Sequence, residues 1–461
     1  MKKYRFSALF ACAAVFASLL LAVPASASGA EGFSVDARHA LLMDAEHDEV
    51  LYEQDADARA YPASITKVMT ALLVLEAVDR GELSLDQVIT ASSTYDADLT
   101  PDGSTQNIQP GEQLTVHQLL QCLLIASANE AANILAETVA GDLESFVALM
   151  NQRAAELGCT GTHFANAHGL HNDNHYTTAH DIYRFVRAAM EYDAFREIVS
   201  TADCYIDATN LSDQRHFFNT NGLLSSLRYT GYVYSGAIGV KTGNTDEAGL
   251  CLAAAAERDG VYLISVVLGA QRTLGATGSE GFNQFSESIR LLDYGFDNFT
   301  RRAILDPLLP LEEVTVTLSK EAESVMVRPA DTVERTLPSN LDLSLIQQDI
   351  TLYADTVEAP VEEGQVLGKV TLSYNGADYG TVDLVATNSV SRDPLLYRLH
   401  QLDEFFSHAW AKILVAVVLV LIALVILRFT LFSRHRRYGS ARYSGRGMHY
   451  SGRRRFPGRR R

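Results

Sequence analysis

Cysteine is scarce in this chain of 461 residues, which contains only five. Cys12 lies in the apolar N-terminal segment, and the other four are widely spaced and form no C-x-x-C pair: Cys122, Cys159, Cys204 and Cys251. This spacing excludes a disulfide-rich scaffold and a cysteine-based metal knuckle. We expect buried thiols, with a disulfide as the alternative if these residues lie outside the cell.

Basic residues are few between positions 29 and 409, where 22 of them stand against all 56 acidic residues, a formal charge of −34. The ends of the chain are opposite in sign, with three basic residues in positions 1–28 and 11 arginines in 433–461. The overall charge of −18 is therefore an average of unlike parts. Such a division predicts that a membrane lies between them.

Proline and glycine, at 11 and 30 residues, are too few for a collagen-like or low-complexity chain. A hydrophobic content of 47% with 20% charged residues also excludes a disordered chain or a coiled coil. The length is sufficient for more than one folded domain.

Two apolar segments predict how the chain is targeted. Residues 1–27 resemble a secretory signal peptide, because three basic residues precede an apolar run that ends in small residues. Residues 410–432 are long and apolar enough to span a bilayer, and we prefer this interpretation to a buried core helix. The arginines of 433–461 then place the tail in the cytoplasm and the acidic body outside the cytoplasmic membrane.

The arginine-rich tail has an alternative interpretation, because such segments also bind nucleic acid. The acidic, exported body in front of it argues against that role. We expect no nucleic-acid partner and favour a tail held at anionic lipid.

The apolar pattern predicts an α+β domain over residues 28–308. A hairpin at its start and three strands near its end would form a five-stranded antiparallel sheet, covered by the helices between them. The expected strands are 40–43, 50–52, 237–240, 250–256 and 261–268, and the expected helices begin near Pro62, Thr115 and Glu130.

After this domain the pattern changes to alternating apolar and polar residues, which predicts a small all-β domain at 309–390. Apolar residues at helical spacing then predict an amphipathic stalk at 391–409, which leads to the transmembrane segment.

Lysine is scarcer than arginine, with four lysines beside 18 arginines in residues 29–409. Only lysine loses its proton near neutral pH when it is desolvated or placed near another cation. Lys67 follows Ser64 by three residues, and this spacing on a helix puts the amine beside the hydroxyl. The pair predicts a nucleophile and its base, although one S-x-x-K match alone is a weak signal.

Two further motifs strengthen this prediction. Ser127-Ala128-Asn129 lies at an expected helix junction, and Lys241-Thr242-Gly243 lies at the end of an expected strand. The three motifs in this order are typical of penicillin-binding proteins and class A β-lactamases.

The chain resembles the low-molecular-mass penicillin-binding proteins, which are serine-type D-alanyl-D-alanine carboxypeptidases. The resemblance covers about 35–390 and includes the segments Y-P-A-S-I-T-K-V-M-T at 61–70, N-A-H-G-L at 166–170, H-Y-T-T-A at 175–179 and G-V-K-T-G at 239–243. It implies a β-lactamase/transpeptidase-like fold. A full membrane span departs from the amphipathic anchor that is usual in that family.

The resemblance also implies the roles of the site residues. Ser64 would be the nucleophile and Lys67 the general base, Ser127 would relay a proton, and Asn129 would hold Lys67 and the substrate amide. The substrate carboxylate would meet Lys241, Thr242, Gly243 and Thr245, with Arg272 as a candidate arginine. The oxyanion would be held by the backbone N–H groups of Ser64 and Asn244.

The implied substrate is the peptidoglycan stem pentapeptide, and β-lactams would be covalent inhibitors. We expect no cofactor and no metal, because the histidines between His163 and His180 match no zinc-enzyme spacing. Two rival functions remain. A β-lactamase is disfavoured because no separate E-x-x-L-N segment follows Ser127, and a sensor is disfavoured because the tail hardly forms an output domain.

Overall fold

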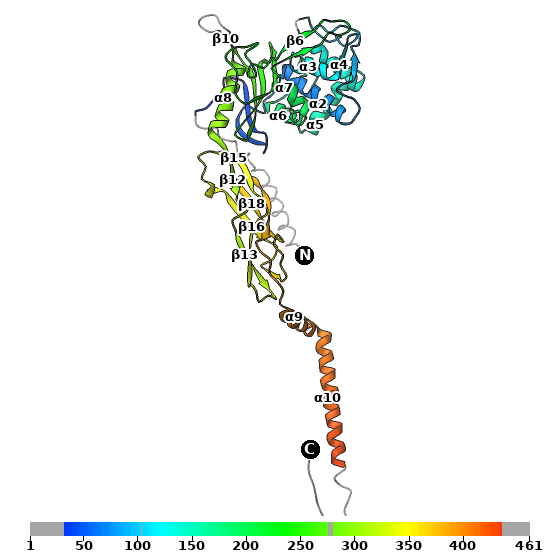
Figure 1. Ribbon diagram of the computed structural model, residues 1–461, viewed down its shortest axis with the longest axis vertical. Helices are drawn as coiled ribbons and strands as arrows, with labels where there is room; N and C mark the ends of the chain where they lie inside the picture. The colour runs from blue at the N-terminus through cyan, green and yellow to red at the C-terminus, as the bar shows by residue number, and fades with distance from the viewer. Residues whose placement is uncertain (1–31, 102, 275–279, 436–461) are drawn as a thin grey trace, which may run out of the picture. The chain divides into compact units, whose positions relative to one another are not determined.

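A computed structural model describes residues 32–101, 103–274 and 280–435 (Figure 1). The expected signal peptide and all but the first residues of the arginine-rich tail lie outside this part of the chain. Two compact units are present. The first contains the described residues up to Pro307 together with Asp331–Ile350 and Val370–Val382, and the second contains Leu308–Ala330, Thr351–Lys369 and the described residues from Asp383 onward.

A five-stranded antiparallel sheet forms the centre of the first unit, with the strand order β2-β1-β9-β8-β7. The expected early hairpin and the three expected late strands are confirmed. The strands are β1 His39–Asp44, β2 Glu49–Gln54, β7 Ala237–Thr245, β8 Gly249–Arg258 and β9 Val261–Ala270. Asp259 and Gly260 join β8 to β9 with φ values of +51° and +76°, as a two-residue hairpin turn requires.

Both faces of this sheet are buried, so successive strand residues enter different cores. Leu41 and Met43 of β1 pack in one core with the helices α2 to α7, whereas Ala40 and Leu42 pack in the other with α8, Asn283–Asn298. Figure 1 shows α8 on one side of the sheet and the helical cluster on the other. Strand β8 therefore carries the buried run Ala253–Ala256, which fits a strand covered on both faces.

The helical cluster holds the expected helices at nearly the expected positions. Helix α3 begins at the expected Thr115, whose hydroxyl accepts from Gln118 N–H while the Gln118 side chain accepts from Thr115 N–H. The cluster comprises the 3-10 turn η1 Ala63–Ile65 and the helices α2 Thr66–Asp79, α3 Val116–Leu124, α4 Asn129–Ala140, α5 Leu143–Glu156, α6 Ala179–Met190 and α7 Asp193–Ser200.

Short antiparallel strand pairs also lie outside the five-stranded sheet, within the first 282 residues of the chain. They are β3 Val88–Thr90 with β4 Gln113–Thr115, β5 Asp203–Ile206 with β6 Arg215–Phe218, and β10 Arg272–Leu274 with β11 Glu280–Phe282.

The C-terminal region is all-β up to residue 386, as its alternating pattern predicts. In β13, Val314 and Val316 are buried while Thr315 and Thr317 are exposed. Strands β12 Phe299–Leu305 and β15 Val333–Pro338 pair with each other. A six-stranded sheet, in the order β16-β18-β19-β14-β13-β17, comprises β13 Glu312–Thr317, β14 Ser324–Pro329, β16 Gln347–Leu352, β17 Thr356–Glu358, β18 Val366–Tyr374 and β19 Ala377–Ala386, and η2 Leu343–Leu345 precedes β16.

Two helices follow this β-region. Helix α9, Pro394–Ser407, is capped by the Asp393 carboxylate, and its apolar residues Leu395, Leu399 and Leu402 are exposed. Helix α10, Ala409–His435, contains a 23-residue stretch, Ala409–Leu431, with a mean hydropathy of 3.0. By length and composition this is a helix able to cross a membrane, and it agrees with the segment expected at 410–432.

All four cysteines in the described residues are free thiols, and Cys204 is the one that is not fully buried. The preferred expectation of buried thiols is thus confirmed for Cys122, Cys159 and Cys251, whereas Cys12 lies outside the described residues.

Candidate active site

Ser64 lies in the tight turn η1, immediately before α2, rather than within an α-helix. The spacing of three residues still brings the expected pair together, because residues i and i+3 eclipse in a 3-10 turn. The Lys67 Nζ donates a hydrogen bond to Ser64 Oγ over 3.0 Å. Ser64 is partly exposed, whereas Lys67 is fully buried.

The Lys67 amine is surrounded by neutral acceptors. It donates to the Asn129 Oδ1 and to the His168 carbonyl, each over 2.7 Å, in addition to the Ser64 hydroxyl. Burial, followed by the charge of Lys241, lowers the pKa of Lys67 well below its ordinary value. A lysine in this environment is suited to accept the proton of a neighbouring hydroxyl.

Ser127 and Asn129 occupy the expected junction between two helices. Ser127 lies between α3 and α4 with φ of +64°, and Asn129 is the first residue of α4. The Asn129 N–H donates to the Ser104 carbonyl over 2.9 Å. A Cβ at Gly103 would lie 2.6 Å from Asn129 Nδ2, so the 103–104 backbone packs closely against this amide.

Lys241, Thr242 and Asn244 lie on β7, which is the edge strand of the sheet and runs on to Thr245, beyond the expected end at Val240. Lys241 is fully buried, and burial, with a smaller contribution from Arg228, lowers its pKa to about 7. Thr242 Oγ1 donates to Thr220 Oγ1 over 2.7 Å. The strand therefore brings to the site a second amine with a lowered pKa and a hydroxyl.

Gly243 explains why β7 and the Ser64 turn approach so closely. A Cβ at this position would lie 2.7 Å from the Pro62 carbonyl oxygen and 3.3 Å from Ser64 N. Any side chain here would separate the strand from the turn.

A cavity of about 370 Å³ joins these elements. Six of the residues expected from the sequence line it: Ser64, Ser127, Thr242, Gly243, Asn244 and the candidate Arg272. Lys67, Asn129 and Lys241 are buried beside it. Thr245 does not belong to the described lining, and its hydroxyl accepts a hydrogen bond from Ala248 N–H over 3.1 Å.

The cavity wall contains residues that the sequence pattern did not reveal. Arg272 is present as expected, but Arg228 lines the same cavity, and so do Ser104 and Thr220. These residues belong to loops and short strands whose sequences carry no motif. Only the folded chain brings them to the cavity.

The N-A-H-G-L segment, residues 166–170, packs against the turn that carries the nucleophile. Gly169 has φ of +90°, and a Cβ there would lie 2.0 Å from the Ala63 carbonyl oxygen. Its N–H donates to Asn166 Oδ1 over 2.7 Å. The preceding residue, His168, presents the carbonyl that accepts from Lys67, and its Nε2 lies 3.1 Å from Asp98 Oδ2.

His175 holds the first turn of α2. Its Nδ1 accepts from the Ala165 N–H over 3.0 Å, so Nε2 carries the proton and donates to Thr66 Oγ1 over 2.7 Å. The Thr66 hydroxyl in turn donates to the Ala63 carbonyl over 2.7 Å. Burial lowers the pKa of His175 to about 3, so it remains neutral, and within the described ranges no group of three or more potential ligands is placed to hold a metal ion.

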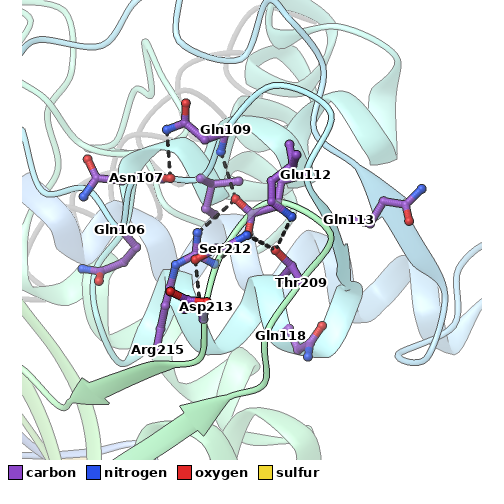
Figure 2. A network of polar contacts seen from close by, with 12 residues as sticks. Gln106, Asn107, Gln109, Glu112, Gln113, Gln118, Thr209, Ser212, Asp213 and Arg215 are labelled. Carbon is purple, nitrogen blue, oxygen red and sulfur yellow. Dashed lines mark hydrogen bonds and ion pairs between the residues drawn. The ribbon is translucent and has the colours of Figure 1, made fainter.

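A buried ion pair anchors the wall that leads to Thr220. Figure 2 shows the fully buried Glu112 carboxylate with the Arg215 guanidinium, whose Nη1 and Nη2 donate over 2.7 and 3.0 Å. The Glu112 carboxylate also accepts from Thr209 Oγ1 over 2.8 Å and from Gln109 N–H over 3.0 Å. These bonds tie the loop after Ser104 to the β5–β6 hairpin.

Comparison with known proteins identifies the family. Residues 25–272 match the peptidase S11 family, described as D-alanyl-D-alanine carboxypeptidase. The D-alanyl-D-alanine carboxypeptidase DacF of Bacillus subtilis is 30% identical over 341 residues, which cover 74% of this chain and 82% of the relative. The chain belongs to the D-alanyl-D-alanine carboxypeptidase family. It is accordingly a serine hydrolase.

Other members of this carboxypeptidase family match over most of their length. DacC of Escherichia coli is 30% identical over 383 residues, covering 82% of this chain and 90% of the relative. Residues 308–392 match the C-terminal domain of penicillin-binding protein 5. The crystal structure of penicillin-binding protein 5 from Haemophilus influenzae superimposes with a TM-score of 0.60 at 28% identity, covering 79% of this chain and 100% of that one.

Proposed function

We propose that this carboxypeptidase removes the terminal D-alanine from peptidoglycan stem pentapeptides through an acyl-enzyme on Ser64. The observation that carries the proposal is the Ser64 hydroxyl in the cavity, 3.0 Å from the buried Lys67 amine. Family membership supplies the reaction class, and the geometry supplies the groups for each step.

In the acylation step, Ser64 Oγ attacks the carbonyl carbon between the two terminal D-alanines, and its proton passes to the neutral Lys67 Nζ. The C–N bond then breaks, and the departing D-alanine amine takes a proton through Ser127. Water later attacks the ester and releases the shortened peptide. The lowered pKa of Lys67 supports its role as the base, because a protonated amine accepts nothing.

The oxyanion formed on the substrate needs donors placed before the reaction. We assign this role to the backbone N–H groups of Ser64 and Asn244, since Gly243 lets the strand that carries Asn244 approach the Ser64 turn. Asn129, whose Oδ1 accepts from Lys67, would use its amide nitrogen to orient the substrate.

We assign the terminal carboxylate of the substrate to the β7 side of the cavity. Lys241 supplies positive charge there, Thr242 offers a hydroxyl, and Gly243 leaves room along the strand. Arg272 and Arg228 on the cavity wall add positive charge. Thr245, which was expected to take part, has its hydroxyl in the turn to Ala248, so its contribution would be to shape β7.

β-Lactams would acylate the same serine, because their strained amide occupies the place of the D-alanyl-D-alanine bond. Labelled penicillin is therefore a probe of Ser64. No cofactor is needed for either reaction.

We also propose the arrangement at the cytoplasmic membrane and the domain limits. The proposed parts are a signal peptide at 1–27, a catalytic domain at 28–308, a β-domain at 309–390, a stalk at 391–409, a membrane span at 410–432 and a cytoplasmic tail at 433–461. This arrangement would place the catalytic domain on the outer side of the membrane. The apolar stretch Ala409–Leu431 and the arginines that follow it support this orientation.

The decisive test is the release of D-alanine from diacyl-Lys-D-Ala-D-Ala by the full chain in detergent. We expect turnover, and we expect Ser64→Ala to form no covalent adduct with labelled penicillin, as read by mass spectrometry. An adduct on the Ser64→Ala chain would contradict the assignment. Rapid hydrolysis of bound penicillin would favour a β-lactamase, and stable acylation without D-alanine release would favour a sensor.

A further inference from the structure

The β5–β6 hairpin, which leads along the chain to the cavity residue Thr220, exposes an aromatic face. Tyr205 pairs with His216 across the hairpin, and Asp203 pairs with Phe218. Because side chains alternate along a strand, these four residues share one face. We call it the aromatic face.

The rings of this face contact one another, Tyr205 stacked on His216 and Phe218 tilted against it, and they are open to solvent. The Tyr205 and His216 ring centroids are 3.9 Å apart with an interplanar angle of 10°, and those of His216 and Phe218 are 4.3 Å apart. Tyr205 is 60% exposed and Phe218 is 38% exposed. The Asp203 carboxylate lies 2.6 Å from His216 Nε2, at the edge of the stack.

The opposite face of the hairpin holds it in place. Ile206 and Phe217 are buried in the core, and Arg215 forms the ion pair with Glu112 shown in Figure 2. The aromatic face is therefore rigid before any ligand arrives, which lowers the entropic cost of binding.

The chain connects the aromatic face to the substrate cavity. Phe218 lies two residues before Thr220, which lines the cavity and is bonded to Thr242. Along an extended chain, two residue steps reach at most about 7 Å, and the four steps from Thr220 to His216 reach at most about 13 Å. Four stem-peptide residues separate the scissile bond from the sugar, and fully extended they also span about 13 Å.

We propose that the aromatic face binds the amino-sugar strand that carries the stem peptide, an inference that rests on the proposed function. The apolar C–H face of a sugar ring stacks on the electron-rich face of an aromatic ring. The Asp203 carboxylate beside the rings offers an acceptor for sugar hydroxyl or amide N–H groups. The face thus has the two features that a neutral carbohydrate requires.

The test compares two substrates that share the scissile bond. Diacyl-Lys-D-Ala-D-Ala has no sugar, whereas uncross-linked glycan strands carry the same terminus on a pentapeptide. For Tyr205→Ala and Phe218→Ala we expect the KM for glycan strands to rise about three- to tenfold, the range of one aromatic contact, with kcat unchanged. Turnover of the diacyl tripeptide should stay within about twofold of the unaltered chain.

Two control variants sharpen this comparison. Tyr353→Ala removes another aromatic ring of similar exposure, 62%, outside the hairpin, and should leave both substrates unaffected. Tyr205→Phe keeps the ring and should retain the lower KM for glycan strands. Equal losses on both substrates, or no loss on glycan strands, would overturn the proposal.

A binding measurement separates this inference from the proposed function. The full chain in detergent should be retained on immobilised, peptide-free glycan strands, and retention should fall for Tyr205→Ala but not for Tyr353→Ala. Absence of D-alanine release from the diacyl tripeptide would refute the proposed function, whereas retention that does not depend on Tyr205 would refute the aromatic face. Self-association that is lost with Tyr205→Ala, without retention on strands, would assign the face to a second copy of the chain.

Discussion

The first unit contains two clusters of buried charge, and they differ in what surrounds each charge. Lys67 donates to a hydroxyl, an amide oxygen and a backbone carbonyl, all of them neutral. Glu112 and Arg215 instead face each other through two hydrogen bonds. Lys67 is bonded to Ser64, which lines the cavity, whereas Arg215 lies five residues before the cavity residue Thr220.

The two clusters therefore have different roles, because the Lys67 cluster is suited to proton transfer and the Glu112–Arg215 pair stabilises the fold. Burial without a counter-ion disfavours the charged form, so the pKa values of Lys67 and Lys241 fall. Burial also raises the pKa of Glu112, but the hydrogen bonds from Arg215 and its neighbours outweigh this and hold it below its usual range. The two lysines therefore lose their protons more readily than an exposed lysine, whereas the Glu112–Arg215 pair remains charged and fixes two loops.

The largest expected effect tests the lysine side of the comparison. Lys67→Arg replaces the neutral amine with a guanidinium that stays protonated and accepts no proton, so acylation by labelled penicillin should slow about 10²- to 10⁴-fold. Lys320→Arg is the matched control, because this exposed lysine pairs with Asp393. A Lys67→Arg chain with near-normal acylation would show that Lys67 is not the base.

The second effect tests the paired cluster. Glu112→Gln leaves Arg215, whose side chain is only 12% exposed, without a carboxylate partner, which should lower the free energy of unfolding by about 3–5 kcal/mol. Urea unfolding followed through the loss of penicillin acylation reports the unit that carries Ser64.

An exposed pair provides the control for this measurement. Arg80 and Glu82 form an ion pair with side chains that are 51% and 58% exposed, so Glu82→Gln should change stability by less than about 1 kcal/mol. Equal losses of unfolding free energy for Glu112→Gln and Glu82→Gln would show that burial does not make the Glu112–Arg215 pair more stabilising than an exposed pair.

The smallest effect concerns pH. Lys241 has a pKa of about 7 in the folded chain and an ordinary value of 10.5, so between these values the unfolded chain binds the extra proton. Stability should therefore rise with pH across this window, by at most about 1.4 kcal/mol per pH unit. The difference in unfolding free energy between the unaltered chain and Lys241→Met, measured at pH 7, 8 and 9, isolates this contribution. A difference that stays constant with pH would show that Lys241 is not neutral when folded.

Much of the fold follows from local patterns. The alternation in 312–317, the apolar runs of β8 and β9 and the capping residue Thr115 each specify an element without help from the rest of the chain. The extent of β7 was underestimated because Lys241 and Asn244 interrupt its apolar run, although both lie within the strand. Pairing with β8 outweighs these local preferences.

The site residues divide in the same way. Ser64 and Lys67 are three residues apart, so the local turn brings them together. Arg228, Ser104 and Thr220 reach the cavity through long-range contacts, and no spacing in the sequence indicates them. Among the residues named from motifs, Thr245 is the one whose hydroxyl is occupied elsewhere.

The sequence by itself determined the reaction class, through three short motifs and the small number of lysines. Each motif is a few adjacent residues, so it can be recognised without knowledge of the residues around it in the fold. Only the tertiary structure decided that Lys67 is enclosed by neutral oxygens, that Glu112 contacts Arg215 and that Tyr205 stacks on His216 in an exposed aromatic face. These features depend on residues up to about a hundred positions apart. Residues so far apart in the sequence become buried together, and come within hydrogen-bond distance, only when the chain folds and packs.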